Sequence, residues 1–528
     1  MALSNSHPNI LLIMADQLAA PALPIYGHPV VKTPAINKFA KSAAIFKNAY
    51  CNFPICAPSR YSMLTGMLPH KINAFDNASE LPASIPTIAH YLTLAGYDTS
   101  LVGKMHFVGP DQLHGFEHRP VTDIYPADFA WVPDWNGGPR NAPTGISMRA
   151  VTEAGPCERS LQLDYDEEVD YFANQVIYDL ARRPEEKPFF MVASFTHPHS
   201  PFTAPQEYWN LYQHEEIDLP KVKEIPFKDL DVHSQWLYYS HSRDRFNITE
   251  EHIRNARHAY YAMISYVDSK IGKILDTLKK MKLDENTVII FTGDHGEMMG
   301  ERGMWFKQTF FEWSSRVPLM ISTPEMRKNN QQKIISEVVS LVDLFPTILD
   351  LAGEKSIALA TTLDGESLVP LITGQAKDWK NIAISEYSDM GVCAPCRMVR
   401  KDQFKYIYTH GHPSQLFDLE VDPIEMVNLC GNTKFASIEE ELKRLVLKDW
   451  NPDELESKIL QSQAARKVIN SAAKKSKLYP NWSFESDRND KKRYVRGSGD
   501  QEGTVAVKGR ARFPFVASTN PDNPPKEI

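Results

Sequence analysis

Short apolar runs alternate with longer segments of helical periodicity along most of this chain. Four runs have the length and composition of strands buried on both faces of a sheet. They are residues 9–14 (NILLIM), 97–102 (YDTSLV), 189–195 (FFMVASF) and 287–292 (TVIIFT). Between the third and fourth runs, apolar residues recur at helical spacing, at Ile264, Val267, Ile271, Ile274 and Leu278. This spacing predicts an amphipathic helix, and the alternation of strands with helices predicts a mostly parallel sheet covered by helices.

Polar side chains follow each of the four predicted strands. They are Asp16 after the first, Lys104 and His106 after the second, His197 and His199 after the third, and Asp294 and His295 after the fourth. A single residue of this kind is usually a helix cap or a turn residue. In an open α/β sheet, however, ligands bind at the carboxyl edge of the strands, so the four ends together predict a functional site.

The pattern changes twice towards the C-terminus. We predict a large α/β domain over residues 1–370, with a mostly parallel sheet between layers of helices, and a smaller α+β domain over residues 371–450. Within the second domain, residues 404–408 and 416–419 predict short antiparallel strands. Residues 451–528 lack strand patterning and are predicted to form a helical and extended tail.

Composition and charge exclude several classes of protein. Apolar residues make up 42% and charged residues 23% of the 528 positions, which is typical of a globular protein. The formal net charge of -8 argues against a nucleic-acid binder. The N-terminal segment lacks a charged region, and its apolar run, residues 10–14, is too short to cross a membrane. Because the chain also has only six cysteines, we expect a cytoplasmic protein with no disulfides and no membrane partner.

One cysteine lies in an unusual setting, Cys56-Ala-Pro-Ser-Arg, followed by Leu64-Thr65-Gly66. A lone cysteine is either a small buried apolar residue or a reactive thiol. Nothing near Cys56 matches a cysteine-protease signature. The pattern CxPSR followed by LTG instead resembles that of type I sulfatases, in which the cysteine is oxidised after synthesis to formylglycine.

The resemblance extends through further motifs in the order and spacing of the alkaline phosphatase and sulfatase superfamily. They are NILLIMADQ, CAPSRYSMLTG, GYDTSLVGKMH, SFTHPHSPF and FTGDHGEMMGERGMWFK, and they cover most of residues 9–350. Residues 109–135 (GPDQLHGFEHRPVTDIYPADFAWVPDW) resemble the choline sulfatases in particular, and the similarity continues in LFDLEVDPIEMVNL at 416–429. The resemblance implies an alkaline phosphatase-like fold, hydrolysis of a small-molecule sulfate ester, and a maturation enzyme that generates formylglycine.

A divalent metal ion is also implied, and its ligands would be Asp16, Asp294, His295 and the modified Cys56. Many sulfatases have Asp-Asp where this chain has Asp16-Gln17, and Asp-Asn where it has Asp294-His295, so one carboxylate is absent. The family favours Ca²⁺, whereas an imidazole ligand is also acceptable to Mn²⁺, zinc or iron.

The mechanism implied by the resemblance is covalent. One hydroxyl of hydrated formylglycine attacks sulfur and forms a sulfo-formylglycine intermediate, and the other hydroxyl expels sulfate as the aldehyde re-forms. Arg60 would neutralise charge in the cluster. Lys104 and Lys307 would stabilise the sulfate oxygens electrostatically.

Two histidines and an amide complete the implied set. His106 would deprotonate the remaining hydroxyl, while His199 would protonate the leaving oxygen, a task that Lys307 shares. Asn77 would contact the sulfate. His197 is expected to be structural or to contact site residues without contacting the substrate.

Choline has no N–H to donate, so a pocket recognises it by aromatic faces and negative charge. Residues 123–135 contain four aromatic side chains, Tyr125, Phe129, Trp131 and Trp135. Such a cluster is usually packing, but Trp131 occupies the tryptophan position of the choline sulfatase pattern. The resemblance also implies a homo-oligomer, a dimer or tetramer, whose exchanged tail brings Asp500 to the choline of a neighbouring subunit.

Cys393-Ala-Pro-Cys-Arg repeats part of the modification signal and contains a CxxC pair. No second CxxC completes a zinc site, and no LTG follows, so we predict a structural segment.

Three functions compete at this point. The first is hydrolysis of choline-O-sulfate to choline and sulfate. The alternative is a phosphonate monoester or phosphodiester hydrolase, or a broader alkylsulfatase, of the same superfamily. A non-enzymatic anion-binding protein is the least favoured, because every catalytic position that can be placed is filled.

Overall fold

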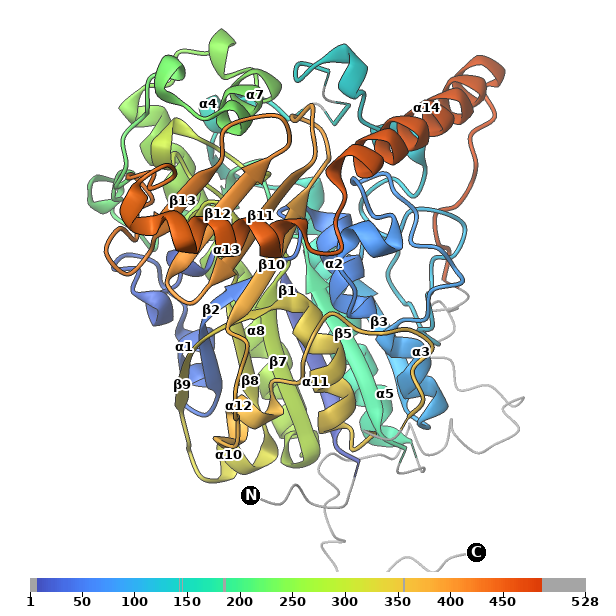
Figure 1. The fold of residues 1–528 in the computed structure, drawn as a ribbon. Helices are drawn as coiled ribbons and strands as arrows, with labels where there is room; N and C mark the ends of the chain where they lie inside the picture. Colours follow the sequence, from blue (N-terminus) through green and yellow to red (C-terminus); the bar gives the residue numbers. More distant parts are fainter. Residues whose placement is uncertain (1–6, 142, 145, 184–186, 355–356, 487–528) are drawn as a thin grey trace, which may run out of the picture.

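The computed structural model describes residues 7–141, 143–144, 146–183, 187–354 and 357–486. Its centre is a seven-stranded sheet in the order β3-β5-β1-β7-β8-β2-β9 (Figure 1). The strands are β1 (Asn9–Ala15), β2 (Ala44–Tyr50), β3 (Asp98–Gly103), β5 (Phe189–Phe195), β7 (Thr287–Gly293), β8 (Leu319–Ser322) and β9 (Lys333–Ser340). Only β8 runs antiparallel to its neighbours in this sheet.

The four strands predicted from sequence are neighbours in this sheet. β3, β5, β1 and β7 lie side by side and are parallel to one another. Each predicted range matches its strand to within one residue at either end. Their carboxyl ends therefore meet at one edge, as the functional site requires.

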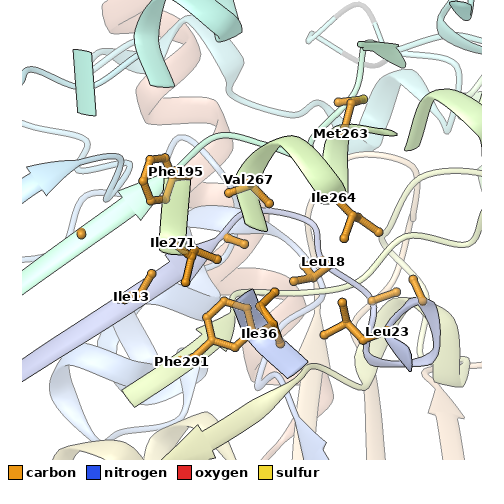
Figure 2. Packing of buried hydrophobic residues seen from close by; sticks show 14 of the residues in the cluster. Ile13, Leu18, Leu23, Ile36, Phe195, Met263, Ile264, Val267, Ile271 and Phe291 are labelled. Carbon is orange, nitrogen blue, oxygen red and sulfur yellow. The ribbon is translucent and has the colours of Figure 1, made fainter. Parts of the chain in front are cut away.

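Helices cover both faces of the sheet, because side chains of each strand alternate between two apolar clusters. Leu11 and Ile13 of β1 belong to the cluster beneath the long helix α8 (Glu250–Lys280), together with α1 (Pro34–Ala40) and α5 (Leu161–Arg182). Figure 2 shows Ile271 of α8 in this cluster with Ile13 and Phe291 of the sheet. The predicted helix at residues 264–278 is thus confirmed, and α8 is longer at its N-terminal end.

The opposite face packs against a second group of helices. Ile10 and Leu12 of β1 lie in the cluster on that side. The helices are α2 (Cys56–Thr65), α3 (Ile88–Leu94), α11 (Leu344–Leu351) and α12 (Val369–Thr373). The large domain also contains shorter elements, namely β4 (Gly155–Cys157), β6 (Thr203–Pro205), α4 (Arg149–Thr152), α6 (Gln206–Trp209), α7 (Val232–Ser240), α9 (Glu312–Ser315) and α10 (Pro324–Lys328).

A second, antiparallel sheet follows in the order β10-β11-β12-β13. Its strands are β10 (Ile382–Tyr387), β11 (Cys396–Lys401), β12 (Phe404–Thr409) and β13 (Gln415–Asp418), and the helices α13 (Ala436–Leu447) and α14 (Pro452–Ser476) follow. The two predicted strands correspond to β12 and β13, and the predicted helical part of the tail corresponds to α14. One apolar cluster joins this sheet to Phe53 and Ile55 of the large domain. The boundary near residue 370 stays a prediction.

All six cysteines are described, and all are free, as expected. Cys396 is buried as the first residue of β11. Within the described ranges, no helix has both the length and the apolar character that crossing a bilayer demands. The cytoplasmic location stays a prediction.

Candidate active site

The carboxyl edge of the large sheet brings four potential ligands together. Asp16 follows β1, Asp294 and His295 follow β7, and Cys56 is the first residue of α2. All four are buried, and one ligand atom from each lies within 4.8 Å of the others. These are the four residues that the sequence predicted as metal ligands.

Helix α2 places Cys56 by backbone contacts at both of its ends. Ile55 precedes the helix but gives it no side-chain cap; instead Asn77 Oδ1 accepts a hydrogen bond from the Ala57 N–H at 2.9 Å. At the other end, Gly66 has φ of 68°, and a Cβ there would lie 3.0 Å from the Phe345 side chain. The glycine of the LTG motif therefore ends the helix where a larger residue would be strained.

Arg60, one turn after Cys56, ties three strand ends to the cluster. Its Nε donates to Asp294 Oδ2 at 2.8 Å, and its Nη1 donates to the Lys104 carbonyl at 2.7 Å and to Ser194 Oγ at 2.9 Å. Burial alone would raise the pKa of Asp294, but Arg60 and His295 lower that pKa to about 2. Arg60 therefore keeps Asp294 ionised although the carboxyl is buried.

The Cys56 sulfur is surrounded by cationic groups. It lies 3.3 Å from Lys104 Nζ, 3.7 Å from Lys307 Nζ and 3.3 Å from His295 Nε2. Burial opposes ionisation of the thiol, yet Lys104, Lys307 and His295 together lower its pKa well below the usual value. The position thus stabilises negative charge on whichever atom stands there.

Lys104 reaches the cluster because Gly103 precedes it. Gly103 has φ of 101°, and a Cβ there would lie 2.1 Å from the Ser194 carbonyl oxygen, so β3 and β5 pack too closely for any other residue. The Lys104 ammonium pairs with Asp16 and lies 4.1 Å from the centre of the Tyr125 ring.

The donor set fits a divalent cation. Two buried carboxylates and one imidazole are hard or borderline ligands of the kind that Ca²⁺ and Mn²⁺ accept, and Cys56 is the fourth residue of the set. Gln17, which replaces a family carboxylate, is engaged elsewhere: its Oε1 accepts from Lys307 Nζ at 2.6 Å, and its Nε2 donates to Glu297. The amide therefore orients Lys307 instead of adding a third carboxylate.

Lys307 and His199 form a pair beside Cys56. His199 Nε2 lies 2.5 Å from Lys307 Nζ, and the Tyr125 hydroxyl lies 3.3 Å from both nitrogens of the same ring. Burial and the Lys307 charge lower the pKa of His199. A neutral His199 accepts a hydrogen bond from Lys307. Of these two side chains, the lysine therefore carries the proton that can be donated.

His106 is buried with both ring nitrogens unpaired among the described residues. Its backbone has φ of 63°, and its N–H donates to Asp123 Oδ2 at 2.6 Å. A buried imidazole without a partner is costly. The ring is therefore available to a substrate or to the group at position 56.

The aromatic cluster divides between the site and the protein interior. Tyr125 and Trp131 lie 4.9 Å apart, and the His106 ring lies 5.0 Å and 5.6 Å from them, so the three rings form one wall. Phe129 instead packs on Trp482 at 5.3 Å, and Trp135 Nε1 donates to the Asp389 carbonyl. The sequence selected Trp131 and missed Tyr125, although both belong to the same run of aromatic residues.

The remaining predicted residues lie elsewhere. His197 donates from Nδ1 to Asp166 Oδ2 at 2.7 Å and packs on Tyr266, which fits the expected structural role. Asp500 lies outside the described residues.

Comparisons with known proteins identify the family. A model of the sulfatase family matches residues 8–354. The chain belongs to the sulfatase family. A second model, for the C-terminal region of N-sulphoglucosamine sulphohydrolase, matches residues 300–451 of this sulfatase. Membership makes the protein a sulfuric ester hydrolase, as the sequence predicted.

Individual relatives agree with this placement. The sulfatase is 40% identical to a choline-sulfatase of Rhizobium meliloti over 501 residues, which cover 94% of this chain and 96% of the relative. It is 30% identical to an arylsulfatase of Clostridium perfringens over 84% of this chain and 94% of the relative. The crystal structure of a phosphonate monoester hydrolase of Agrobacterium radiobacter superposes with a TM-score of 0.66 at 26% identity, covering 86% of this chain and 96% of that one.

Proposed function

We propose that this sulfatase hydrolyses choline-O-sulfate to choline and sulfate through a covalent sulfo-formylglycine intermediate. The observation that carries the choice of substrate is the wall of Tyr125, Trp131 and His106 beside the buried cluster. Aromatic faces next to a sulfate site suit an ester whose alcohol bears a quaternary ammonium. Similarity to a choline-sulfatase along nearly the whole chain supports the same substrate.

Maturation of Cys56 to formylglycine would provide the nucleophile at the N-terminus of α2. Asp16, Asp294, His295 and the matured residue would hold a divalent metal ion, for which we favour Ca²⁺ with Mn²⁺ as the alternative. Such an ion acts as a Lewis acid towards a sulfate oxygen and lowers the pKa of the attacking hydroxyl. A separate maturation enzyme would install the aldehyde.

In the first half of the reaction, one hydroxyl at position 56, which has already lost its proton to solvent because its pKa is lowered, forms a bond to sulfur as the S–O bond to choline breaks. Lys104 and Lys307 neutralise charge on the sulfate oxygens, consistent with their distances from Cys56 Sγ. Lys307, hydrogen-bonded to His199, gives its proton to the choline oxygen as that oxygen takes up the electron pair.

In the second half, His106 removes the proton of the remaining hydroxyl. The carbonyl bond re-forms, the S–O bond to position 56 breaks, and sulfate leaves with the electron pair. The place of His106 supports this role, because its side chain acts on Cys56 and helps to lower the pKa of that thiol, and its ring nitrogens have no other hydrogen-bond partner among the described residues. Asn77, fixed by the Ala57 N–H, would contribute its amide N–H to sulfate.

The proposal includes a homo-oligomer, a dimer or tetramer, in which an exchanged tail supplies Asp500 to the choline. Support comes from the last described residues, which lie along the loop that carries the aromatic wall. Trp482 packs on Phe129, and the Phe484 ring lies 5.5 Å from the Arg119 guanidinium. A monomeric mass of the full chain by light scattering would contradict this part.

The phosphonate monoester hydrolase alternative is favoured by one observation, the similarity of the fold to such an enzyme. We expect kcat/KM for choline-O-sulfate to exceed that for the choline ester of methylphosphonic acid by at least about tenfold, or ~1.4 kcal/mol of transition-state binding. The two esters share the alcohol and a single negative charge, so the comparison isolates the transferred group. A faster reaction of the phosphonate would support the alternative.

A further inference from the structure

The C-terminal helix α14 carries three polar side chains on one face that contact neighbouring loops. Gln463 and Arg466 are buried, with exposed fractions of 3% and 7%, although most of the helix is exposed. Gln463 Oε1 accepts from the Trp135 N–H at 3.0 Å, and Lys467 pairs with Asp134. Arg466 is held by a bidentate contact, because its two terminal nitrogens donate to the two oxygens of Asp76 at 2.6 Å each.

Asp76 shapes the short loop that holds Asn77. Its Oδ1 accepts from the Ala78 N–H at 2.9 Å and from Ser79 Oγ at 3.2 Å. Asn77 is fixed on both sides: its N–H donates to Asp389 Oδ2 at 3.0 Å, and its side-chain oxygen accepts from the Ala57 N–H. Ala57 directly follows Cys56. A continuous path of contacts thus runs from Arg466 through the loop to the residue that bears the nucleophile.

The charge balance of this region depends on one cation. Asp76 and Asp389 are both fully buried and close to each other. Arg466 forms the only ion pair of Asp76 among the described residues. Without the Arg466 guanidinium, the buried carboxyls of Asp76 and Asp389 would have no cation in contact with Asp76. The loop that carries Asp76 would then have to move, either to admit water or to separate the two carboxyls.

We propose that Arg466 is a positioning residue of the active site: through Asp76 it holds Asn77 against the N-terminus of the Cys56 helix. The C-terminal helix then sets the distance between the sulfate-contacting amide and the nucleophile. This inference rests on the proposed function, because it takes Asn77 to be a sulfate contact. It adds that part of the sulfate site is built by a segment 390 residues further along the chain.

A double-mutant cycle with matured protein tests the path. We expect Arg466→Met and Asn77→Ala each to lower kcat/KM for choline-O-sulfate by about 10- to 100-fold, since displacement of a positioned group has effects of this size. Because both substitutions break the same path, the double variant should be little worse than either single one. Lys467→Met, on the same face of α14, is the matched control and should leave kcat/KM close to that of the native protein.

Different results overturn different statements. Full additivity of the two losses would overturn the positioning role while leaving the proposed function intact. If Asn77→Ala has native kcat/KM, both the sulfate contact and the path through it are wrong. If Arg466→Met fails to fold, the double substitution Arg466→Met with Asp76→Asn takes its place in the cycle. This double substitution removes both members of the ion pair and so leaves no unpaired buried charge. Additivity with Asn77→Ala would again overturn the positioning role.

Discussion

Replacement of Cys56 by alanine is expected to lower kcat by at least about 10⁴-fold, the size of loss seen when a covalent nucleophile is removed. The reason is that three cationic groups of the site lie around this one atom. Lys104, Lys307 and His295 surround Cys56 Sγ, and none of them has an oxygen that could replace it as the nucleophile. Initial rates on choline-O-sulfate, with sulfate release as the readout, measure the effect.

Cys51→Ala is the matched control for this substitution. Cys51 is also fully buried, but it packs in the apolar cluster under α2, and its pKa is raised by burial. Its removal should cost some stability and leave kcat nearly unchanged. Mass spectrometry of the peptide that contains Cys56 should find the aldehyde in the active native protein. Turnover retained in Cys56→Ala would contradict the covalent mechanism.

Removal of the metal by a chelator is expected to abolish turnover and to lower the melting temperature. Asp16 and Asp294 are completely buried, so without a divalent ion their charges are balanced by Arg60, Lys104 and His295 alone among the described residues. At a metal concentration 100 times the dissociation constant, binding adds about 2.7 kcal/mol to the free energy of unfolding. Calorimetry and initial rates before and after chelation, followed by addition of Ca²⁺ or Mn²⁺, measure both effects.

Asp294→Asn should reproduce the effect of the chelator on turnover, because the amide provides no charge for the ion and weakens the contact with Arg60. Glu312→Gln, at a buried carboxylate that pairs with Lys405 away from this cluster, is a suitable control for stability alone. Full activity in the chelated protein, with no change in melting temperature, would contradict the metal site.

The main sheet and the ligand cluster could be predicted because their signals are local. β1, β5 and β7 are buried on both faces, so their sequences are short and apolar, and the polar residues after them stand out. Parallel strands then bring Asp16, Asp294 and the residues after β3 to one edge irrespective of loop structure. The motif around Cys56 places this residue at the start of a helix at that edge.

Other contacts could not be predicted because they depend on loops that the pattern does not describe. Tyr125 and Phe129 look alike in sequence, but only the former faces His199, across a separation of 74 residues. In the sequence, Gln17 stands only as the replacement of a metal-binding carboxylate, whereas in the structure its side-chain oxygen accepts a hydrogen bond from Lys307 and orients that lysine. Arg466 carried no signal, since an arginine in an exposed helix is usually a surface charge.

The most direct test of the proposed function compares kcat/KM for choline-O-sulfate with that for 3,3-dimethylbutyl sulfate, which replaces the cationic nitrogen by carbon. We predict a preference for choline of at least about tenfold, since a desolvated cation held by aromatic faces gains up to ~2 kcal/mol and Asp500 would add to it. Trp131→Ala and Asp500→Asn should each reduce the preference, whereas Phe129→Leu, in the same turn but facing Trp482, should retain it. Equal values for the two esters in the native protein would contradict choline recognition and identify a general alkylsulfatase.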